Sequence, residues 1–186
     1  MPNLENVLNS QKRFNGVRAN FVVDATGNFV GKSGSSRDIS NESDLAVLKK
    51  LRSLTDVIVT DAATARRERY QPSKWAPIVI WSKSGNFSEI SESPALWRET
   101  TPNPAVALAE LRTRFQSILL ETGPTLTRLI AEAKLIDELK LTVVDSDSEF
   151  SATATAFAFA NNLSLEYLEI KDLQEVASTF FFTLGR

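Results

Sequence analysis

The chain of 186 residues contains neither cysteine nor histidine. Without cysteine it cannot form a disulfide, a thiolate metal site or a thiol nucleophile. Without histidine it lacks the most common general base and the most common transition-metal ligand. Ser-His-Asp hydrolases and zinc enzymes are therefore excluded, and we expect no metal site. What remains is chemistry in which the protein positions the reactants and a cofactor carries the reaction.

A strong charge of one sign and a long apolar segment are also missing. The net charge is only −2, so no basic field would attract a nucleic acid by counterion release, and we expect no such partner. No apolar run approaches the roughly 20 residues that cross a bilayer, so we expect no membrane span. Residues 1–15 lack the apolar core and the small-residue cleavage site of a secretory signal. We therefore expect a cytoplasmic protein.

The rest of the composition is that of an ordinary globular domain. Hydrophobic residues make up 42% of the chain and charged residues 24%. A chain of this length is expected to bury about 70% of the surface that its unfolded form exposes. No linker divides it, so we predict a polar arm over residues 1–15, with at most one helical turn, followed by one domain over residues 16–186.

Short apolar strands alternate with helices along most of the chain. The predicted strands cover residues 17–23, 56–60, 77–82, 96–100, 117–121 and 138–144. The predicted helices cover residues 41–54, 62–69, 104–115 and 124–133. This alternation is typical of a parallel sheet with helices on both faces. We predict irregular structure at residues 145–161 and an antiparallel hairpin made by residues 163–170 and 176–184.

Two apolar groups carry predictions about packing. Four leucines at a spacing of three in the first predicted helix are expected to face the core: Leu45, Leu48, Leu51 and Leu54. The three aromatics Phe180–Phe182 point to alternating faces of the last strand. We therefore expect that strand to lie centrally in the sheet or to be covered by a dimer contact.

Ligands of open parallel sheets bind beyond the carboxyl ends of the strands. Three segments are placed there by the predicted topology: the loop after Val23, the turn over residues 60–64 and the turn over residues 121–125. Where a strand leads into a helix, free N–H groups and the positive end of the helix dipole face outward. That arrangement suits the diphosphate of a dinucleotide.

Three blocks of sequence resemble one known family, the reductase (C-terminal) domain of the riboflavin-biosynthesis deaminase/reductases. VRANFVVDATGNFVGKSG (residues 17–34) resembles the family's V-R-A-N-x-V-x-S-L-D-G followed by G-x-S. LRSLTDVIVTDAATARRERY (residues 51–70) resembles L-R-x-x-x-D-V-x-L-V-G-A-G-T-V-R-A-E-x-Y. LLETGPTLTRLIAEAKLIDELKLTVV (residues 119–144) resembles L-x-E-G-G-P-T-L followed by L-x-D-E-L-x-L-T.

The resemblance implies a fold and an activity. The fold is α/β and dihydrofolate-reductase-like, with three layers, α/β/α, a mostly parallel central sheet and a C-terminal antiparallel hairpin. The activity is the NADPH-dependent reduction of a pyrimidine-type small molecule, 5-amino-6-(5-phosphoribosylamino)uracil, by a homodimer. The motifs identify no catalytic residue.

The resemblance also assigns cofactor contacts to the two turns. These residues are Asp61, Ala63, Thr64, Arg66, Thr122, Gly123, Pro124, Thr125 and Leu126. Thr64 is expected to bond a phosphate oxygen, and Arg66 to reach a phosphate such as the 2′-phosphate of NADPH. Asp61, Ala63 and Thr122 stand where the family has glycine. Asp61 brings a carboxylate next to the expected anion, and Thr122 narrows the approach of the backbone to the cofactor.

Five residues are the expected substrate contacts: Asn20, Thr26, Ser33, Asp44 and Glu121. Thr26 stands where the family has an aspartate, a change that would alter what binds. Asp44 lies in a segment that resembles the dihydrofolate reductase helix with an acidic substrate anchor. The resemblance places Glu121 at a strand end as a carboxylate that faces the substrate.

Two alternatives to this reductase remain open at the level of the sequence. One is a non-catalytic protein of the same fold that binds a nucleotide or a partner, and the other is a reductase with a different substrate. Thr26, Asp61 and Thr122 favour a departure from the family's chemistry, whereas the retained Thr64 and Arg66 favour an enzyme. An open groove between the two turns would support dinucleotide binding. A groove filled by the side chains of Asp61 and Thr122 would contradict the enzyme.

Overall fold

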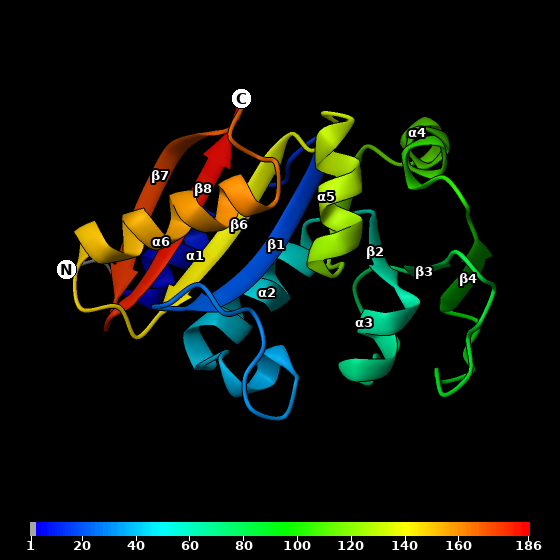
Figure 1. Ribbon diagram of the computed structural model, residues 1–186, viewed down its shortest axis with the longest axis horizontal. Coiled ribbons are helices and arrows are strands. Elements are labelled where there is room, and N and C mark those ends of the chain that lie inside the picture. Colours follow the sequence, from blue (N-terminus) through cyan, green and yellow to red (C-terminus); the bar gives the residue numbers. More distant parts are fainter. Residues whose placement is uncertain (1–2) are drawn as a thin grey trace.

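The computed structural model describes residues 3–186, in which a mixed sheet lies between two layers of helices (Figure 1). The strands are β1 (Gly16–Asp24), β2 (Val57–Asp61), β3 (Ile78–Ser82), β4 (Leu96–Thr100), β5 (Ser117–Leu120), β6 (Glu138–Val144), β7 (Glu169–Val176) and β8 (Thr179–Gly185). The α-helices are α1 (Leu4–Ser10), α2 (Glu42–Ser53), α3 (Ala62–Arg67), α4 (Pro104–Arg114), α5 (Pro124–Glu132) and α6 (Glu149–Asn162). One 3-10 turn covers Ser36–Asp38.

The eight strands follow the order β4-β3-β2-β5-β1-β6-β8-β7. Strands β1 to β6 pair in parallel wherever they are neighbours. β8 pairs antiparallel with β6 and with β7. The predicted α/β architecture, a mostly parallel sheet with a C-terminal antiparallel hairpin, is therefore confirmed. Because β1, β2 and β5 are parallel neighbours, the segments that follow them meet at one edge of the sheet.

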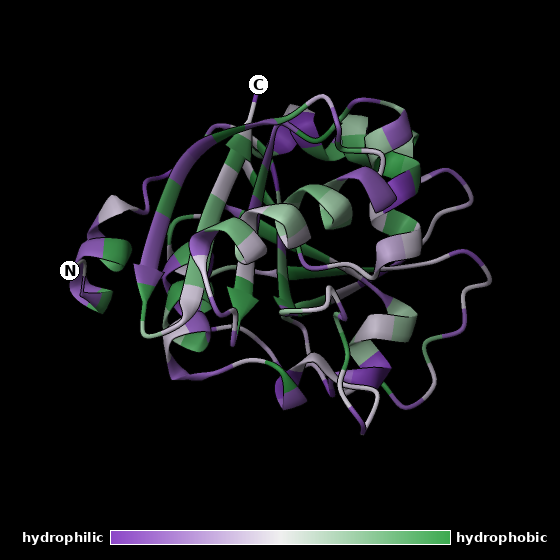
Figure 2. Ribbon diagram, turned by 60° about the vertical axis from the view of Figure 1, so that its left-hand side comes forward, coloured by the Kyte–Doolittle hydropathy of each residue, from purple (hydrophilic) through white to green (hydrophobic). Residues whose placement is uncertain are grey.

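Each face of the sheet carries its own apolar core. Helices α4, α5 and α6 cover one face, where Leu108 and Phe159 are buried. Helices α1, α2 and α3 cover the other, where Val7 and Leu51 are buried. In Figure 2 the central strands are largely hydrophobic, whereas polar residues concentrate on the outer surfaces of the helices and in the loops. The chain therefore has the three layers that the resemblance implies.

Helix α2 begins where the sequence predicts, but its leucines do not share one face. Asn41 is the N-cap, and its Oδ1 accepts a hydrogen bond from the Asp44 N–H at 3.0 Å. Leu51 is buried, but Leu45 is 44% exposed, so the prediction of a common core face is wrong. A spacing of three is shorter than the 3.6-residue helical turn, so successive leucines point in different directions and cannot all face the core.

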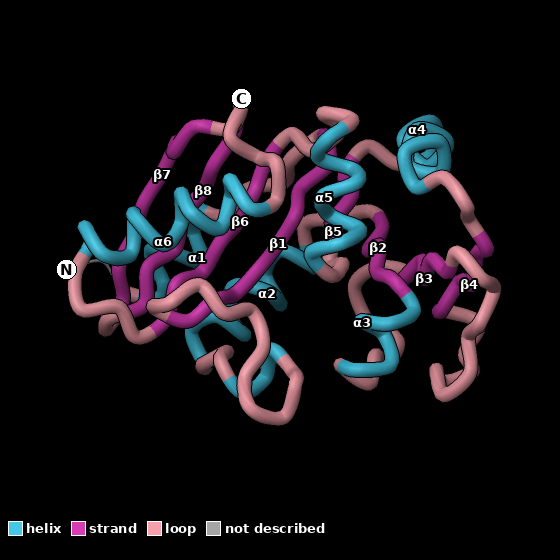
Figure 3. Tube along the Cα trace, viewed as in Figure 1, coloured by secondary structure: helices cyan, strands magenta, loops and turns pink. Residues whose placement is uncertain are grey.

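The structure corrects the prediction at both ends of the chain (Figure 3). Residues 4–10 form the complete helix α1, rather than at most one turn. Residues 149–162, predicted to be irregular, form α6, which packs beside β6 and β8. The first strand of the hairpin accordingly begins at Glu169 rather than at residue 163. The helical signal at α6 was the apolar spacing of Ala152, Ala156 and Phe159, which threonine and asparagine of low helix propensity obscured.

Phe180–Phe182 lie in β8, one strand in from the edge of the sheet. Phe180 and Phe182 are buried in the core with α6, and Phe181 is buried in the core with α2. The predicted central position of these aromatics is confirmed. Among the described residues, no helix combines the length and the apolar character that crossing a membrane requires.

Candidate functional site

A cavity of about 330 Å³ lies beside β1 and the end of β5. Its walls come from Asn20 on β1, Leu48 on α2, the segment that follows α3, and residues 121–123. Phe29 and Arg37, from the long loop after β1, complete it. The volume lies at the lower end of the range of roughly 300–1,000 Å³ that small-molecule sites have. The cavity therefore suits one small ring with a short substituent.

Asp44 brings a buried carboxyl group to the wall of this cavity. It lies in the first turn of α2, and the Ser40 hydroxyl donates to its Oδ2 at 2.6 Å. Burial raises the pKa of Asp44, although hydrogen bonds with Ser40 and Thr142 act in the opposite direction. A carboxyl group that retains its proton can both donate and accept a hydrogen bond.

Glu121 also lines the cavity, but side chains of the same wall hold its oxygens. Arg52 donates from Nε to Oε1 at 2.8 Å and from Nη2 to Oε2 at 2.5 Å. The Tyr70 hydroxyl donates to Oε2 as well. Such a two-pronged ion pair fixes both partners in one geometry. Glu121 therefore positions Arg52 and Tyr70. A ligand in the cavity would contact the outer surfaces of these two side chains.

Two pKa shifts follow from this network. Burial, followed by the negative charge of Glu121, raises the pKa of Tyr70 well above its ordinary value. Burial acts to lower the pKa of Arg52, but the hydrogen bond and charge of Glu121, together with Tyr70, outweigh burial and raise that pKa. Tyr70 is thus a proton-bearing donor and Arg52 a fixed cation at neutral pH.

Glu68 ties the loop after β1 to the cavity. The Ser35 hydroxyl donates to Glu68 Oε2 at 2.6 Å, and the Ser36 N–H donates to Oε1 at 2.9 Å. Arg37 donates to the Glu68 carbonyl at 2.5 Å. One buried carboxylate thereby holds the segment that covers one side of the cavity.

Asp61 joins the two turns at which the sequence predicts a dinucleotide. It ends β2 and is the N-cap of α3, where its Oδ1 accepts from the Thr64 N–H at 2.8 Å. Its Oδ2 accepts from the Thr64 hydroxyl at 2.8 Å and from the Gly123 N–H at 2.7 Å. The carboxylate therefore already uses donors from both turns.

Thr122 and Gly123 differ in what they contribute to the second turn. The Thr122 and Thr127 hydroxyls are hydrogen-bonded at 2.7 Å, within the protein. Gly123 is the N-cap of α5 and, having no side chain, offers no capping oxygen. A Cβ at Gly123 would lie 3.1 Å from Thr64 Oγ1 and 3.4 Å from Asp61 Oδ2. The two turns are thus joined through the Asp61 carboxylate, and Thr64, Thr122 and Gly123 still line the cavity, so the groove is narrowed by Asp61 but not closed by Asp61 and Thr122 together.

The structure brings only part of the predicted site together. Around the 330 Å³ cavity it gathers Asn20, Asp44, Thr64, Glu121, Thr122 and Gly123. Thr26 is exposed and donates to Asp24, and Ser33 lines a different hollow, of about 490 Å³, beside Asp24 and Asp145.

The other predicted cofactor residues lie outside that cavity. Ala63 and Thr125 are exposed, Pro124 is the first residue of α5, and Leu126 packs against the core. Arg66 donates to the Asn86 carbonyl at 3.2 Å.

Sequence reasoning did not assign three residues that shape the cavity: Arg52, Glu68 and Tyr70. All three stand in the second block, where the family motif shows arginine, glutamate and tyrosine at the same places. That agreement was the available signal. Their partners, Glu121 for two of them and the loop after β1 for the third, are distant in sequence.

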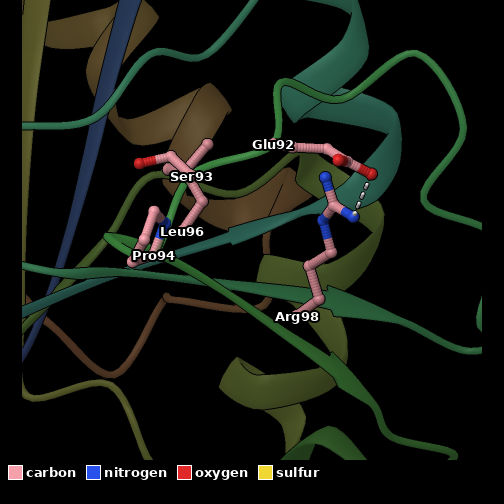
Figure 4. A pocket seen from close by; sticks show the side chains of 5 residues that line it. All are labelled: Glu92, Ser93, Pro94, Leu96 and Arg98. Atoms are coloured by element: carbon pink, nitrogen blue, oxygen red, sulfur yellow. Dashed lines mark ion pairs between the residues drawn. The ribbon is translucent and has the colours of Figure 1, made fainter.

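A second hollow, of about 420 Å³, is unsuited to the same chemistry (Figure 4). It lies at the start of β4, where Arg98 faces Glu92 at 3.7 Å. Arg98 also donates to the carbonyls of Ile90 and Ser91. Its charge is therefore already engaged. Within residues 3–186, no cluster of three or more acidic side chains is arranged to hold a metal ion.

The chain has relatives at the level of sequence family and of fold. The RibD C-terminal domain family model matches residues 16–145. No curated protein matches the chain. The structure of a pyrimidine reductase-like protein from Corynebacterium diphtheriae is similar, with a TM-score of 0.70, 17% identity, and coverage of 99% of this chain and 98% of that one.

Two further solved structures have the same fold at lower identity. A Thermotoga maritima deaminase/5-amino-6-(5-phosphoribosylamino)uracil reductase has a TM-score of 0.65 at 12% identity, over 92% of this chain but only 56% of that one. The Enterococcus faecalis dihydrofolate reductase, in complex with NADP(H), has a TM-score of 0.64 at 12% identity, over 92% and 96% of the two chains. Both likenesses support the dihydrofolate-reductase-like architecture.

Proposed function

This chain belongs to the RibD C-terminal domain family, and on that premise we propose that it is a reductase of a pyrimidine-type small molecule. One observation carries the proposal: the buried carboxyl group of Asp44 faces a cavity of about 330 Å³. Burying a carboxyl group that has no polar partner costs free energy of folding, because burial disfavours its charged form. Facing a cavity, it can instead recognise the polar edge of a flat ring.

The raised pKa of Asp44 favours recognition of one kind of edge. Burial raises its pKa, which favours the protonated carboxyl. That form donates through its O–H and accepts through its other oxygen, which matches the adjacent N–H and C=O of a uracil-type ring. Arg52 and Tyr70, fixed by Glu121, form another part of the same wall. We propose that the ring lies between this wall and Asp44.

NADPH is the reductant that the family resemblance implies. The residues present do not fit its diphosphate as they stand, because Asp61 holds the Thr64 and Gly123 donors that a phosphate would need. This observation favours a second candidate function, in which the chain binds a pyrimidine-type ligand without reducing it. Homodimer formation, which the resemblance implies, and a cytoplasmic location, which we expect from the composition, remain part of the proposal.

Titration with 5-amino-6-(5-phosphoribosylamino)uracil, and with its dephosphorylated form, tests the substrate half by thermal shift. A ligand at 100 times its Kd stabilises the folded chain by about 2.7 kcal/mol. We expect Asp44→Ala to weaken binding roughly tenfold to a hundredfold, the effect of losing a hydrogen bond at a buried group. Asp147→Ala, at an exposed aspartate, is the matched control.

Three outcomes distinguish the candidates. Equal binding by Asp44→Ala and the wild-type chain would contradict the placement of the ring. Preference for the dephosphorylated form would identify a reductase with a different substrate. Binding of the ligand without any loss of NADPH absorbance, under conditions where NADPH is bound, would favour ligand binding without turnover.

A further inference from the structure

The two turns beyond β2 and β5 already contain an anion, and it belongs to the chain itself. Asp61 ends β2, and its carboxylate accepts from the N–H and the hydroxyl of Thr64. The same carboxylate accepts from the N–H of Gly123, across the sheet on the turn into α5. The three distances lie between 2.7 and 2.8 Å, which are full hydrogen bonds.

These donors are the ones that a bound diphosphate would use. A phosphate needs backbone N–H groups and hydroxyls that point at it, with helix N-termini behind them. Here the Asp61 carboxylate occupies that position, and a second anion would meet both a filled space and a like charge. Gly123 approaches Thr64 closely, since a Cβ added at Gly123 would lie 3.1 Å from Thr64 Oγ1.

Thr122 also stands where the family has glycine, but its side chain does not take up the donors that a diphosphate would need. Its hydroxyl is bonded to that of Thr127, and the side chain is buried. Arg66 donates to the Asn86 carbonyl at 3.2 Å, and Arg67 donates to the Thr64 hydroxyl at 3.4 Å. Neither forms an ion pair with Asp61 in the part of the chain that the structure describes. The obstacle to a cofactor is therefore a single carboxylate.

We infer that Asp61 is a specificity-determining residue that stands in for the cofactor diphosphate and lowers the affinity of this chain for nicotinamide dinucleotides. The inference rests on the proposed function, since it assumes that the turns correspond to the family's cofactor site. A nicotinamide compound without any phosphate, reduced nicotinamide riboside, does not need these donors. The Asp61 carboxylate therefore does not compete with it.

Two variants remove the charge in different ways. Asp61→Asn keeps an oxygen that can cap α3 and accept from Thr64, whereas Asp61→Gly restores the residue of the family motif and frees all three donors. Asp147→Asn serves as the control, because Asp147 is exposed on the approach to α6. Binding of NADPH and of reduced nicotinamide riboside is measured directly, by tryptophan fluorescence and by thermal shift.

We expect weak NADPH binding by the wild-type chain and by Asp147→Asn. Both Asp61 variants should bind NADPH at least roughly tenfold more tightly, because a like charge close to the phosphate is removed. The affinity for reduced nicotinamide riboside should change much less. Circular dichroism and the unperturbed Tm of Asp61→Asn establish that the variant is folded.

Two results would overturn the inference. Equal NADPH affinity in wild type and both variants would mean that Asp61 does not compete with the cofactor. If that shared affinity for NADPH is high, the proposed reductase function is still supported. Absence of NADPH binding in all folded variants would mean that these turns are no diphosphate site. The Asp44 titration, which uses no cofactor, then decides separately whether the pyrimidine site exists.

Discussion

Asp44 and Glu121 face one cavity, yet their partners give them different properties. Glu121 is held by Arg52 and Tyr70, so its charge is balanced inside the wall. Asp44 has only hydroxyl partners, and burial raises its pKa. On this difference rests our proposal that Asp44 is the carboxyl that recognises the ligand, while Glu121 positions Arg52 and Tyr70.

The raised pKa of Asp44 predicts how stability depends on pH. Since the folded state holds this proton more tightly than the unfolded state, whose pKa is about 3.9, the contribution of Asp44 is greatest below about pH 4. It falls as the pH rises towards the folded-state pKa of Asp44 and then levels off. Urea unfolding at a series of pH values should therefore show wild type losing stability relative to Asp44→Asn above about pH 4. A difference that stays constant, or that grows in favour of wild type, would contradict the assignment.

At the scale of single elements, α6 depends on one face of small and aromatic side chains. Ala152, Ala156 and Ala160 are buried against the sheet. The ring of Phe159 meets the ring of Phe21, on β1, edge to face at a centroid distance of 5.2 Å. Because β1 also lines the cavity, the packing of α6 supports the site from the opposite face of the sheet.

Two phenylalanines of α6 test this packing in a matched pair. Phe159 is 6% exposed and Phe157 is 46% exposed, two residues apart on one helix. We expect Phe159→Ala to lower the free energy of unfolding by about 3–5 kcal/mol, through lost burial and an unfilled cavity. Phe157→Ala should cost about 1 kcal/mol or less. Equal losses in urea denaturation would mean that α6 does not pack as described.

At the scale of the whole molecule, the C-terminal hairpin is part of the sheet rather than an appendage. The family model ends at residue 145, but β8 lies between β6 and β7, and its phenylalanines enter both cores. Removing β8 would expose one edge of β6 and open the two apolar cores at once.

A chain that ends at Asn162 therefore should not fold cooperatively. It would keep the strands β1 to β6 and the helix α6, but would lose the buried Phe180 and Phe182. We expect the near-ultraviolet circular dichroism to disappear and the urea transition to broaden, compared with the full chain. A sharp transition with native near-ultraviolet signals would show that the hairpin is dispensable.

The sequence by itself determined the order of most elements and the family. Periodicity and start signals such as Asn41 and Pro104 are local, so each strand and helix that they mark could be located without its neighbours. The same reasoning failed to predict the helix α6, whose buried face can be recognised only from its packing on the sheet. It also failed for Leu45, which the helical turn carries to the surface.

Only the tertiary structure decided the character of the site. The sequence identified Asp61 as an unusual carboxylate, but not that it bonds to Gly123 across the sheet. It identified Glu121, but not that Arg52 and Tyr70 hold both of its oxygens. The physical reason is that hydrogen bonds and ion pairs act over a few ångströms, and folding alone brings such distant residues within that range.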